Sequence, residues 1–143
     1  MPLYLTTQTE QLIRHHAETA YPNECCGFLL GKYNPGGVKK DVREIFQMTN
    51  QRADSPQNRF LISPEETLRA EKEAVRRGLE IVGYYHSHPD HPARPSEYDF
   101  HHTPWPGYSS IIVQSFQKGT GELTSWILRE DRSTMDQEDL IIK

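Results

Sequence analysis

Two histidines separated by one residue, His86 and His88, are the side chains whose type and spacing point most directly to chemistry. They follow residues 81–85, an apolar and aromatic run with one glycine, which is typical of a buried strand. Because side chains alternate along a strand, both imidazoles are expected to point to the same side at the end of the strand. Such a pair can supply two ligands to a metal ion.

Two polar residues follow this pair at a spacing that fits a helical turn. Ser96 lies eight residues after His88, and Asp99 follows three residues later, so both are expected on one face of a short helix. Two imidazoles and one carboxylate leave a fourth tetrahedral position for water, which is the arrangement of a catalytic zinc. A structural interpretation stays open. A serine followed by an acid three residues later is also a helix-start signature, and an isolated His-x-His pair is often structural.

The arrangement of these residues resembles the JAMM motif of the MPN-domain (JAB, Mov34) metalloprotease family. One matching block is P-x-E-x-C-G-F-L-x-G, which contains Glu24. The other is H-S-H-P at residues 86–89, followed by Ser96 and Asp99. Both blocks occur in the family's order, and the resemblance covers residues 8–129, most of the chain.

The resemblance implies a role for each matching residue. His86, His88 and Asp99 would be the ligands of one Zn²⁺ ion per chain. Glu24 would be the general base and acid, although without the resemblance it would be read as a surface carboxylate in a loop. Ser96 would donate a hydrogen bond to the developing oxyanion. Because Ser96 is also the predicted N-cap, the two roles compete for one hydroxyl group.

Five other residues near the motif are secondary candidates. Asp90 and His91, in the loop after the histidine pair, are candidates for contact with substrate or with the metal ligands. His101 and His102 are left outside the metal site, since a third imidazole ligand would depart from the family pattern. Trp105, between two prolines, is expected to pack against the domain rather than to line the site.

The resemblance also implies a fold and a reaction. The fold would be a single α/β domain with a mixed β-sheet flanked by helices, similar to the cytidine-deaminase-like architecture. The reaction would be hydrolysis of an amide or isopeptide bond at the C-terminal Gly-Gly tail of a ubiquitin-like protein. A bare domain of 143 residues resembles the prokaryotic stand-alone members, whose substrates include small sulfur-carrier proteins.

Two alternatives compete with this hydrolase. A catalytically inactive MPN scaffold that binds partners is disfavoured, because inactive members usually lose metal ligands and this chain keeps them. A nucleoside deaminase on the similar fold would need H-x-E and P-C-x-x-C. The chain has His88 where the glutamate would stand and no C-x-x-C, which excludes the deaminase.

Composition excludes other classes of protein. The net charge is −4 with no basic stripe, so nucleic-acid binding has no electrostatic basis. No apolar run approaches the roughly 20 residues of a membrane span, and the first residues do not form a signal peptide. The two adjacent cysteines, Cys25 and Cys26, are expected to be buried and unpaired in a reducing cytoplasm.

Periodicity and turn residues predict the elements that position these groups. A catalytic domain at 1–130 would be followed by a polar, frayed C-terminal tail at 131–143. In the second helix, which begins at a capping box on Ser63, the apolar positions are Leu68 and Val75. The predicted elements are helices at 8–20 with Thr7 as N-cap, at 64–77 and at 96–102, and strands at 26–33, 38–48, 60–62, 81–85, 108–115 and 122–129, with a turn at 34–37 and a loop at 50–58.

Overall fold

The structure is a computed structural model that describes residues 2–33, 40–48, 63–103 and 105–143. The predicted turn at 34–37, loop at 50–58 and strand at 60–62 lie outside these residues. The described elements, in chain order, are β1 (Leu3–Leu5), α1 (Thr7–Ala20), β2 (Cys26–Tyr33), β3 (Lys40–Met48), α2 (Pro64–Arg76), β4 (Glu80–Pro89), α3 (Glu97–His102), β5 (Ser109–Phe116), β6 (Gly119–Leu128), β7 (Met135–Glu138) and β8 (Leu140–Ile142).

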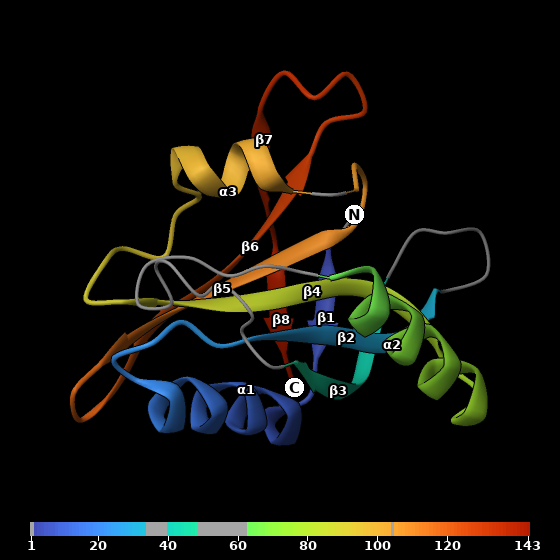
Figure 1. Ribbon diagram of the computed structural model, residues 1–143, viewed down its shortest axis with the longest axis horizontal. Helices are drawn as coiled ribbons and strands as arrows, with labels where there is room; N and C mark the ends of the chain where they lie inside the picture. The colour runs from blue at the N-terminus through green and yellow to red at the C-terminus, as the bar shows by residue number, and fades with distance from the viewer. Residues whose placement is uncertain (1, 34–39, 49–62, 104) are drawn as a thin grey trace.

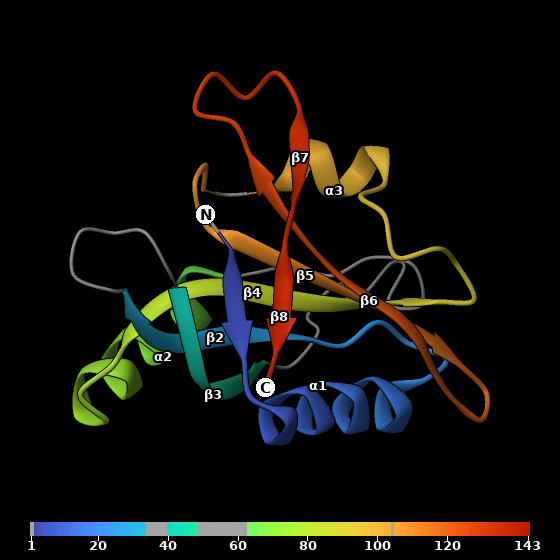
Figure 2. The ribbon, with the colours of Figure 1, turned by 180° about the vertical axis from the view of Figure 1, so that it is seen from behind.

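These strands form one mixed, eight-stranded sheet in the order β7-β6-β5-β4-β2-β3-β1-β8. β4 pairs in parallel with β5, and β1 pairs in parallel with both β3 and β8, while the other pairs are antiparallel. Figures 1 and 2 show the strand that begins the chain lying beside the strand that ends it. The architecture is therefore the α/β domain with a mixed sheet and flanking helices that the sequence predicted.

Helices cover both faces of the central strands, which explains why β2 is apolar at nearly every position. Leu29 packs in a cluster with Ile13 of α1. Its neighbour Phe28 packs in a second cluster with Ala70 of α2. Because successive side chains of a strand point to opposite faces, β2 separates two cores. None of the described helices has the length and apolar character that crossing a membrane requires.

The first helix begins one residue earlier than the sequence predicted. Thr6 is the N-cap, since its backbone is extended and its Oγ1 accepts a hydrogen bond from the amide of Thr9 at 3.0 Å. Thr7 is the first helical residue. Glu10 pairs with Arg14 at 2.9 Å, one turn further along. The predicted capping box of Thr7 and Glu10 was therefore wrong by one position.

The second helix begins as predicted but buries a different face. Ser63 is the N-cap, and a proline follows it at the start of the helix. Leu68 and Val75, predicted as its apolar positions, are 52% and 77% exposed, whereas Ala70 and Ala74 are buried. The small alanines let the helix backbone lie close to the sheet, and the larger side chains remain on the solvent side.

The last thirteen residues are not a frayed tail. β7 pairs with β6, and β8 pairs with β1, with Leu140 opposite Leu3. β7 is short and polar, so backbone pairing with β6 stabilises it more than an apolar face does. β8 is short but apolar, and its Leu140 also packs against the core cluster that contains Leu3. β4 also runs further than predicted, to Pro89, so the two histidines lie inside the strand rather than beyond its end.

A buried ion pair joins β3 to β7 across the sheet. Lys40 Nζ lies 3.6 Å from Glu138 Oε2 and donates to Ser109 Oγ at 2.6 Å, and the lysine side chain is 1% exposed. Burial lowers the pKa of Lys40, and the Glu138 carboxylate opposes that shift. Removing one partner of a buried pair leaves an uncompensated charge.

We therefore expect Lys40→Ala to lower the free energy of unfolding by about 3–5 kcal/mol, measured by urea denaturation. The exposed Lys118 provides the control, since Lys118→Ala should change the free energy of unfolding by less than about 0.5 kcal/mol. Equal effects of the two substitutions would show that the Lys40–Glu138 pair does not stabilise the sheet.

Candidate metal centre and active site

Three side chains from two elements converge on one point. His86 and His88 project from the same face of β4, and Asp99 projects from the first turn of α3. Asp99 Oδ2 lies 2.8 Å from His88 Nε2 and 3.2 Å from His86 Nε2, and the two Nε2 atoms are 3.1 Å apart. All three residues are buried, and they are positioned to bind a metal ion. The three residues predicted as metal ligands therefore lie close together in the structure.

The arrangement of the donor atoms fits a metal ion, because without an ion between them an imidazole lone pair would face a carboxylate oxygen. His88 Nδ1 lies 2.8 Å from the carbonyl oxygen of Pro92, which can only accept, so Nδ1 carries the proton. The lone pair on His88 Nε2 therefore faces the acceptor oxygen of Asp99. Tetrahedral zinc, with ligands at about 2.0–2.1 Å, would hold its ligand atoms about 3.4 Å apart. The observed separations of 2.8–3.2 Å are close to that value.

Burial and charge favour the protonation states in which His86 and Asp99 can bind a metal ion. Burial lowers the pKa of His86, which keeps the imidazole neutral at physiological pH. Burial alone would raise the pKa of Asp99, but the charge and hydrogen bonds of His86 and His88 in their protonated forms outweigh it and hold that pKa well below its usual range. A metal ion bound to the neutral imidazoles would supply the same positive charge beside the carboxylate. A neutral imidazole and an ionised carboxylate are the forms that bind a metal ion.

A capping box at the start of α3 fixes both Ser96 and Asp99. Ser96 Oγ accepts from the amide of Asp99 at 3.0 Å, and Asp99 Oδ2 accepts from the amide of Ser96 at 2.9 Å. A hydroxyl group that accepts one hydrogen bond still has its own proton to donate. The two roles considered for Ser96, helix cap and donor to a substrate oxygen, therefore do not exclude each other.

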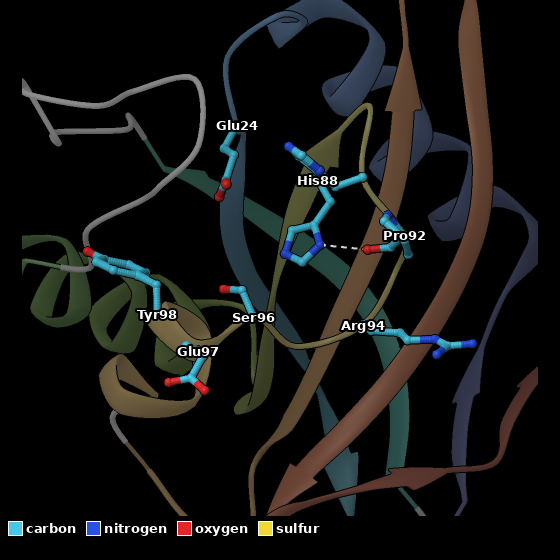
Figure 3. Close-up of a pocket in the computed structure, with 8 residues that line it drawn as sticks. Glu24, His88, Pro92, Arg94, Ser96, Glu97 and Tyr98 are labelled. Atoms are coloured by element: carbon cyan, nitrogen blue, oxygen red, sulfur yellow. Dashed lines mark hydrogen bonds between the residues drawn. The ribbon is translucent and has the colours of Figure 1, made fainter.

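Glu24 lies across a cavity from His88, one of the three clustered side chains (Figure 3). Cys26 is paired with His86 in the sheet register, and the hydrogen bond from Ser87 N to the carbonyl oxygen of Cys25 continues this alignment by one residue. Glu24, the next residue outward, therefore lies beside the end of β4 that carries His88. The cavity has a volume of about 480 Å³, and Glu24, His88 and Ser96 all line it. The carboxylate is almost fully buried, with the residue 4% exposed. The resemblance was the only signal in the sequence that could have located Glu24.

Other residues around the cavity had weaker signals or none. His91, a secondary candidate, lines the cavity, as do Arg94 and Tyr98, which sequence analysis did not single out. Asp90 does not line it, but its carboxylate accepts a hydrogen bond from Tyr21 at 2.7 Å. Nothing in their spacing marks Arg94 and Tyr98. Arg94 reaches the cavity through the bend of the loop between β4 and α3, and Tyr98 lies in the first turn of α3, which follows that loop.

Three remaining predictions concern residues outside the metal group, which consists of His86, His88 and Asp99. The exposed His101 lies 3.7 Å from Glu97 and takes no part in the metal group. His102 ends α3, and its side chain is outside the described part of the structure. Trp105 packs against Phe28 and Tyr84, with ring centroids 6.4 and 6.3 Å away, as predicted.

The two cysteines are unpaired and buried, as predicted. Burial raises the pKa of Cys25 to about 12 and raises the pKa of Cys26 as well. The reactive thiolate is therefore scarcely populated at pH 7–8. We expect no reaction of the native chain with a thiol-directed chromogenic disulfide over minutes, and reaction of both thiols in urea. Rapid labelling of either cysteine in the native protein would contradict this prediction.

An α/β domain that holds two histidines and an aspartate around one point, with a buried glutamate across an open cavity, has the groups of a hydrolase active site. Residues 6–129 match the family described as prokaryotic homologs of the JAB domain, and the chain belongs to that family. It is a JAB-type hydrolytic enzyme.

Named relatives share this region of the chain. The chain is 37% identical to a desampylase from Pyrococcus furiosus over 108 residues, which are 75% of this chain and 68% of the relative. It is 31% identical to a desampylase from Haloferax volcanii, covering 72% of this chain and 73% of the relative. It is 30% identical to a probable TtuB-protein conjugate cleaving protease from Thermus thermophilus, covering 72% and 64%.

Solved structures confirm the fold. The solution structure of a protein from Desulfitobacterium hafniense superposes with a TM-score of 0.84 at 32% identity, covering 99% of this chain and 92% of the other. The crystal structure of a JAB1/MPN domain protein from Archaeoglobus fulgidus superposes with a TM-score of 0.55 at 18% identity, covering 96% and 98%. The second comparison supports the architecture alone.

Proposed function

We propose that this chain is a zinc-dependent hydrolase. Its substrate would be an amide or isopeptide bond at the C-terminal Gly-Gly tail of a ubiquitin-like or sulfur-carrier protein. The observation that carries this proposal is the position of Glu24, buried in the same cavity as His88 and Ser96. The names of the relatives from Pyrococcus, Haloferax and Thermus support the substrate class, because the Thermus relative is described as cleaving protein conjugates.

Each residue has a distinct task in this reaction. His86, His88 and Asp99 would hold zinc, which supplies Lewis acidity and makes a water molecule at the site more acidic. The Glu24 carboxylate accepts a proton from the attacking water and later gives it to the leaving amine. The Ser96 hydroxyl donates a hydrogen bond to the oxygen of the scissile carbonyl as negative charge develops there.

The surroundings of Glu24 suit this exchange of a proton. The Glu24 carboxylate is largely buried, and it lines a cavity that is open to an entering chain. His88 is held in one orientation by the Pro92 carbonyl oxygen, so little rearrangement is needed when substrate arrives. A tail of glycines lacks side chains, and its backbone can therefore approach the site closely.

Cleavage of an extended carrier tests this proposal. The substrate is a small ubiquitin-like sulfur carrier with several residues added after its Gly-Gly end, and mass spectrometry identifies the bond that is cut. We expect cleavage directly after Gly-Gly by the zinc-loaded chain, and greatly reduced cleavage when both glycines are replaced by alanine. An intact carrier, in a preparation that contains zinc, would contradict the proposed substrate class.

The proposed compartment is the cytoplasm. Both cysteines are free thiols, which suits a reducing environment. A ubiquitin-like substrate made in the cytoplasm would meet the enzyme there.

A further inference from the structure

The segment that carries Glu24 belongs to no helix or strand. It connects the end of α1, at Ala20, to the start of β2, at Cys26. The loop from β4 to α3 lies at the same end of the molecule (Figures 1 and 2). A carboxylate that must meet a water molecule at hydrogen-bond distance needs a fixed backbone, so the contacts that hold this segment determine where Glu24 lies.

The inner contact is made by Ser87, the residue between the two histidines. Its amide donates to the carbonyl oxygen of Cys25 at 3.1 Å, which is an ordinary antiparallel sheet bond. The return bond is different, because the amide of Cys25 donates to the Ser87 side-chain oxygen at 2.8 Å. A side chain has thus replaced a backbone acceptor one residue beyond the last sheet pair, between Cys26 and His86.

The hydrogen bond from Cys25 to the Ser87 side chain affects the position of Glu24. The Ser87 hydroxyl lets the backbone of Cys25 stay attached to β4 without continuing the ladder, and the chain leaves the sheet at the next residue outward, Glu24. Ser87 is fully buried and Cys25 is 3% exposed, so water cannot easily replace this bond. Side chains alternate along β4, and Ser87 therefore points away from the face that carries His86 and His88.

The outer contact joins the same segment to the loop after β4. The Tyr21 hydroxyl donates to Asp90 Oδ2 at 2.7 Å. Asp90 has a backbone φ of +58°, a conformation that non-glycine residues adopt uncommonly, and its amide donates to the carbonyl oxygen of Ser115 on β5 at 2.8 Å. The sheet therefore holds Asp90, and Asp90 holds the segment three residues before Glu24.

We propose that Ser87 and the Tyr21–Asp90 pair are positioning residues that hold Glu24 over the metal-binding group. The inference rests on the proposed function of Glu24 as general base. The two contacts lie on either side of Glu24 along the chain, and both attach it to the stretch that contains His88. One is buried and the other is exposed, so they can be removed independently.

Removing either contact should lower turnover more than binding. A displacement of about 1 Å at a catalytic group can cost about 100-fold in rate. We expect Ser87→Ala to lower kcat by about 10- to 100-fold and Tyr21→Phe by about 3- to 10-fold, with KM changed less than about 2-fold in both. Ser87→Thr, which keeps the hydroxyl group, should recover most of the activity lost in Ser87→Ala.

Matched controls remove the same chemical group elsewhere. Ser115→Ala removes a buried hydroxyl for which the described residues offer no hydrogen-bond partner, and it keeps the backbone carbonyl oxygen that accepts from Asp90. Tyr33→Phe removes a hydroxyl at the far end of β2. Neither should change kcat by more than about 2-fold. In a double-mutant cycle, Tyr21→Phe and Asp90→Gly should not be additive, since glycine tolerates the positive φ and each substitution removes the same bond.

A second readout does not depend on activity. Amide hydrogen exchange, followed by NMR in the chain without metal, should be fast at Cys25 in Ser87→Ala and slow in Ser87→Thr and Ser115→Ala.

Unchanged kcat in both Ser87→Ala and Tyr21→Phe would overturn the proposal, as would unchanged exchange at Cys25. If the wild-type chain cleaves no conjugate, the proposed function fails, while the exchange data still decide whether Ser87 holds the segment. Should Ser87→Ala not fold, the Tyr21→Phe and Asp90→Gly cycle decides.

Discussion

Replacing Glu24 with glutamine is expected to lower kcat for conjugate cleavage by about 10²- to 10⁴-fold, the usual contribution of a general acid–base group. Glutamine has nearly the same shape, but its amide cannot accept and return a proton at neutral pH. Because Glu24 lies in the cavity that also contains His88 and Ser96, its loss should affect the chemical step without removing a predicted metal ligand. The measurement is steady-state cleavage of an extended carrier, together with zinc content.

The matched control is Glu18→Gln on the exposed face of α1. This variant should retain wild-type kcat, and Glu24→Gln should retain wild-type zinc. If Glu24→Gln cleaves the carrier at the wild-type rate, another group accepts the proton, and the role proposed for Glu24 is wrong.

Replacing His88 with alanine is expected to reduce bound zinc from about one per chain to less than about one-tenth, and cleavage with it. His88 Nε2 lies 2.8 Å from Asp99 Oδ2 and 3.1 Å from His86 Nε2, so its removal takes one donor from a group of three. Two remaining donors do not make the three-ligand set of a catalytic zinc site. The measurement is metal analysis by mass spectrometry after dialysis against zinc-buffered solution.

The control for this experiment is His101→Ala. His101 is an exposed imidazole near the metal group but outside it, so this variant should bind as much zinc as the wild type. Far-UV circular dichroism should confirm that the His88→Ala chain is folded. Full zinc occupancy in a folded His88→Ala chain would show that the ion binds somewhere else.

The metal group could be predicted because its geometry is local. His86 and His88 share a face through strand alternation alone, and Ser96 and Asp99 are linked by the hydrogen bonds of one helix start. Such relations depend on spacing along the chain, which a sequence displays directly. The helix start at Ser63 could be predicted for the same reason.

The position of Glu24 could not be predicted from local sequence patterns. It reaches the cavity because β2 pairs with β4 in a register that places Cys26 opposite His86. Nothing within the sequence around Glu24 states that pairing, and only the resemblance to a family supplied it. The hydrogen bond from Cys25 to Ser87 depends on the same register.

The errors have the same physical origin. Leu68 and Val75 are apolar, yet the packing of α2 against the sheet selected Ala70 and Ala74, a choice made by tertiary contact rather than by hydrophobicity. β8 was missed because its partner is β1, at the opposite end of the chain. A three-residue segment such as Leu140–Ile142 is too short to give a periodic signal, and the strand it pairs with lies far away in the sequence.

The most direct test of the central claim is a zinc titration of the chelated chain, followed by carrier cleavage at each step. The account predicts no cleavage without metal and a linear rise in rate with added zinc. The rise should stop at about one equivalent per chain, and an excess of chelator should abolish it. Cleavage that is equally fast in chelator, or a chain that binds no zinc at neutral pH, would contradict the account.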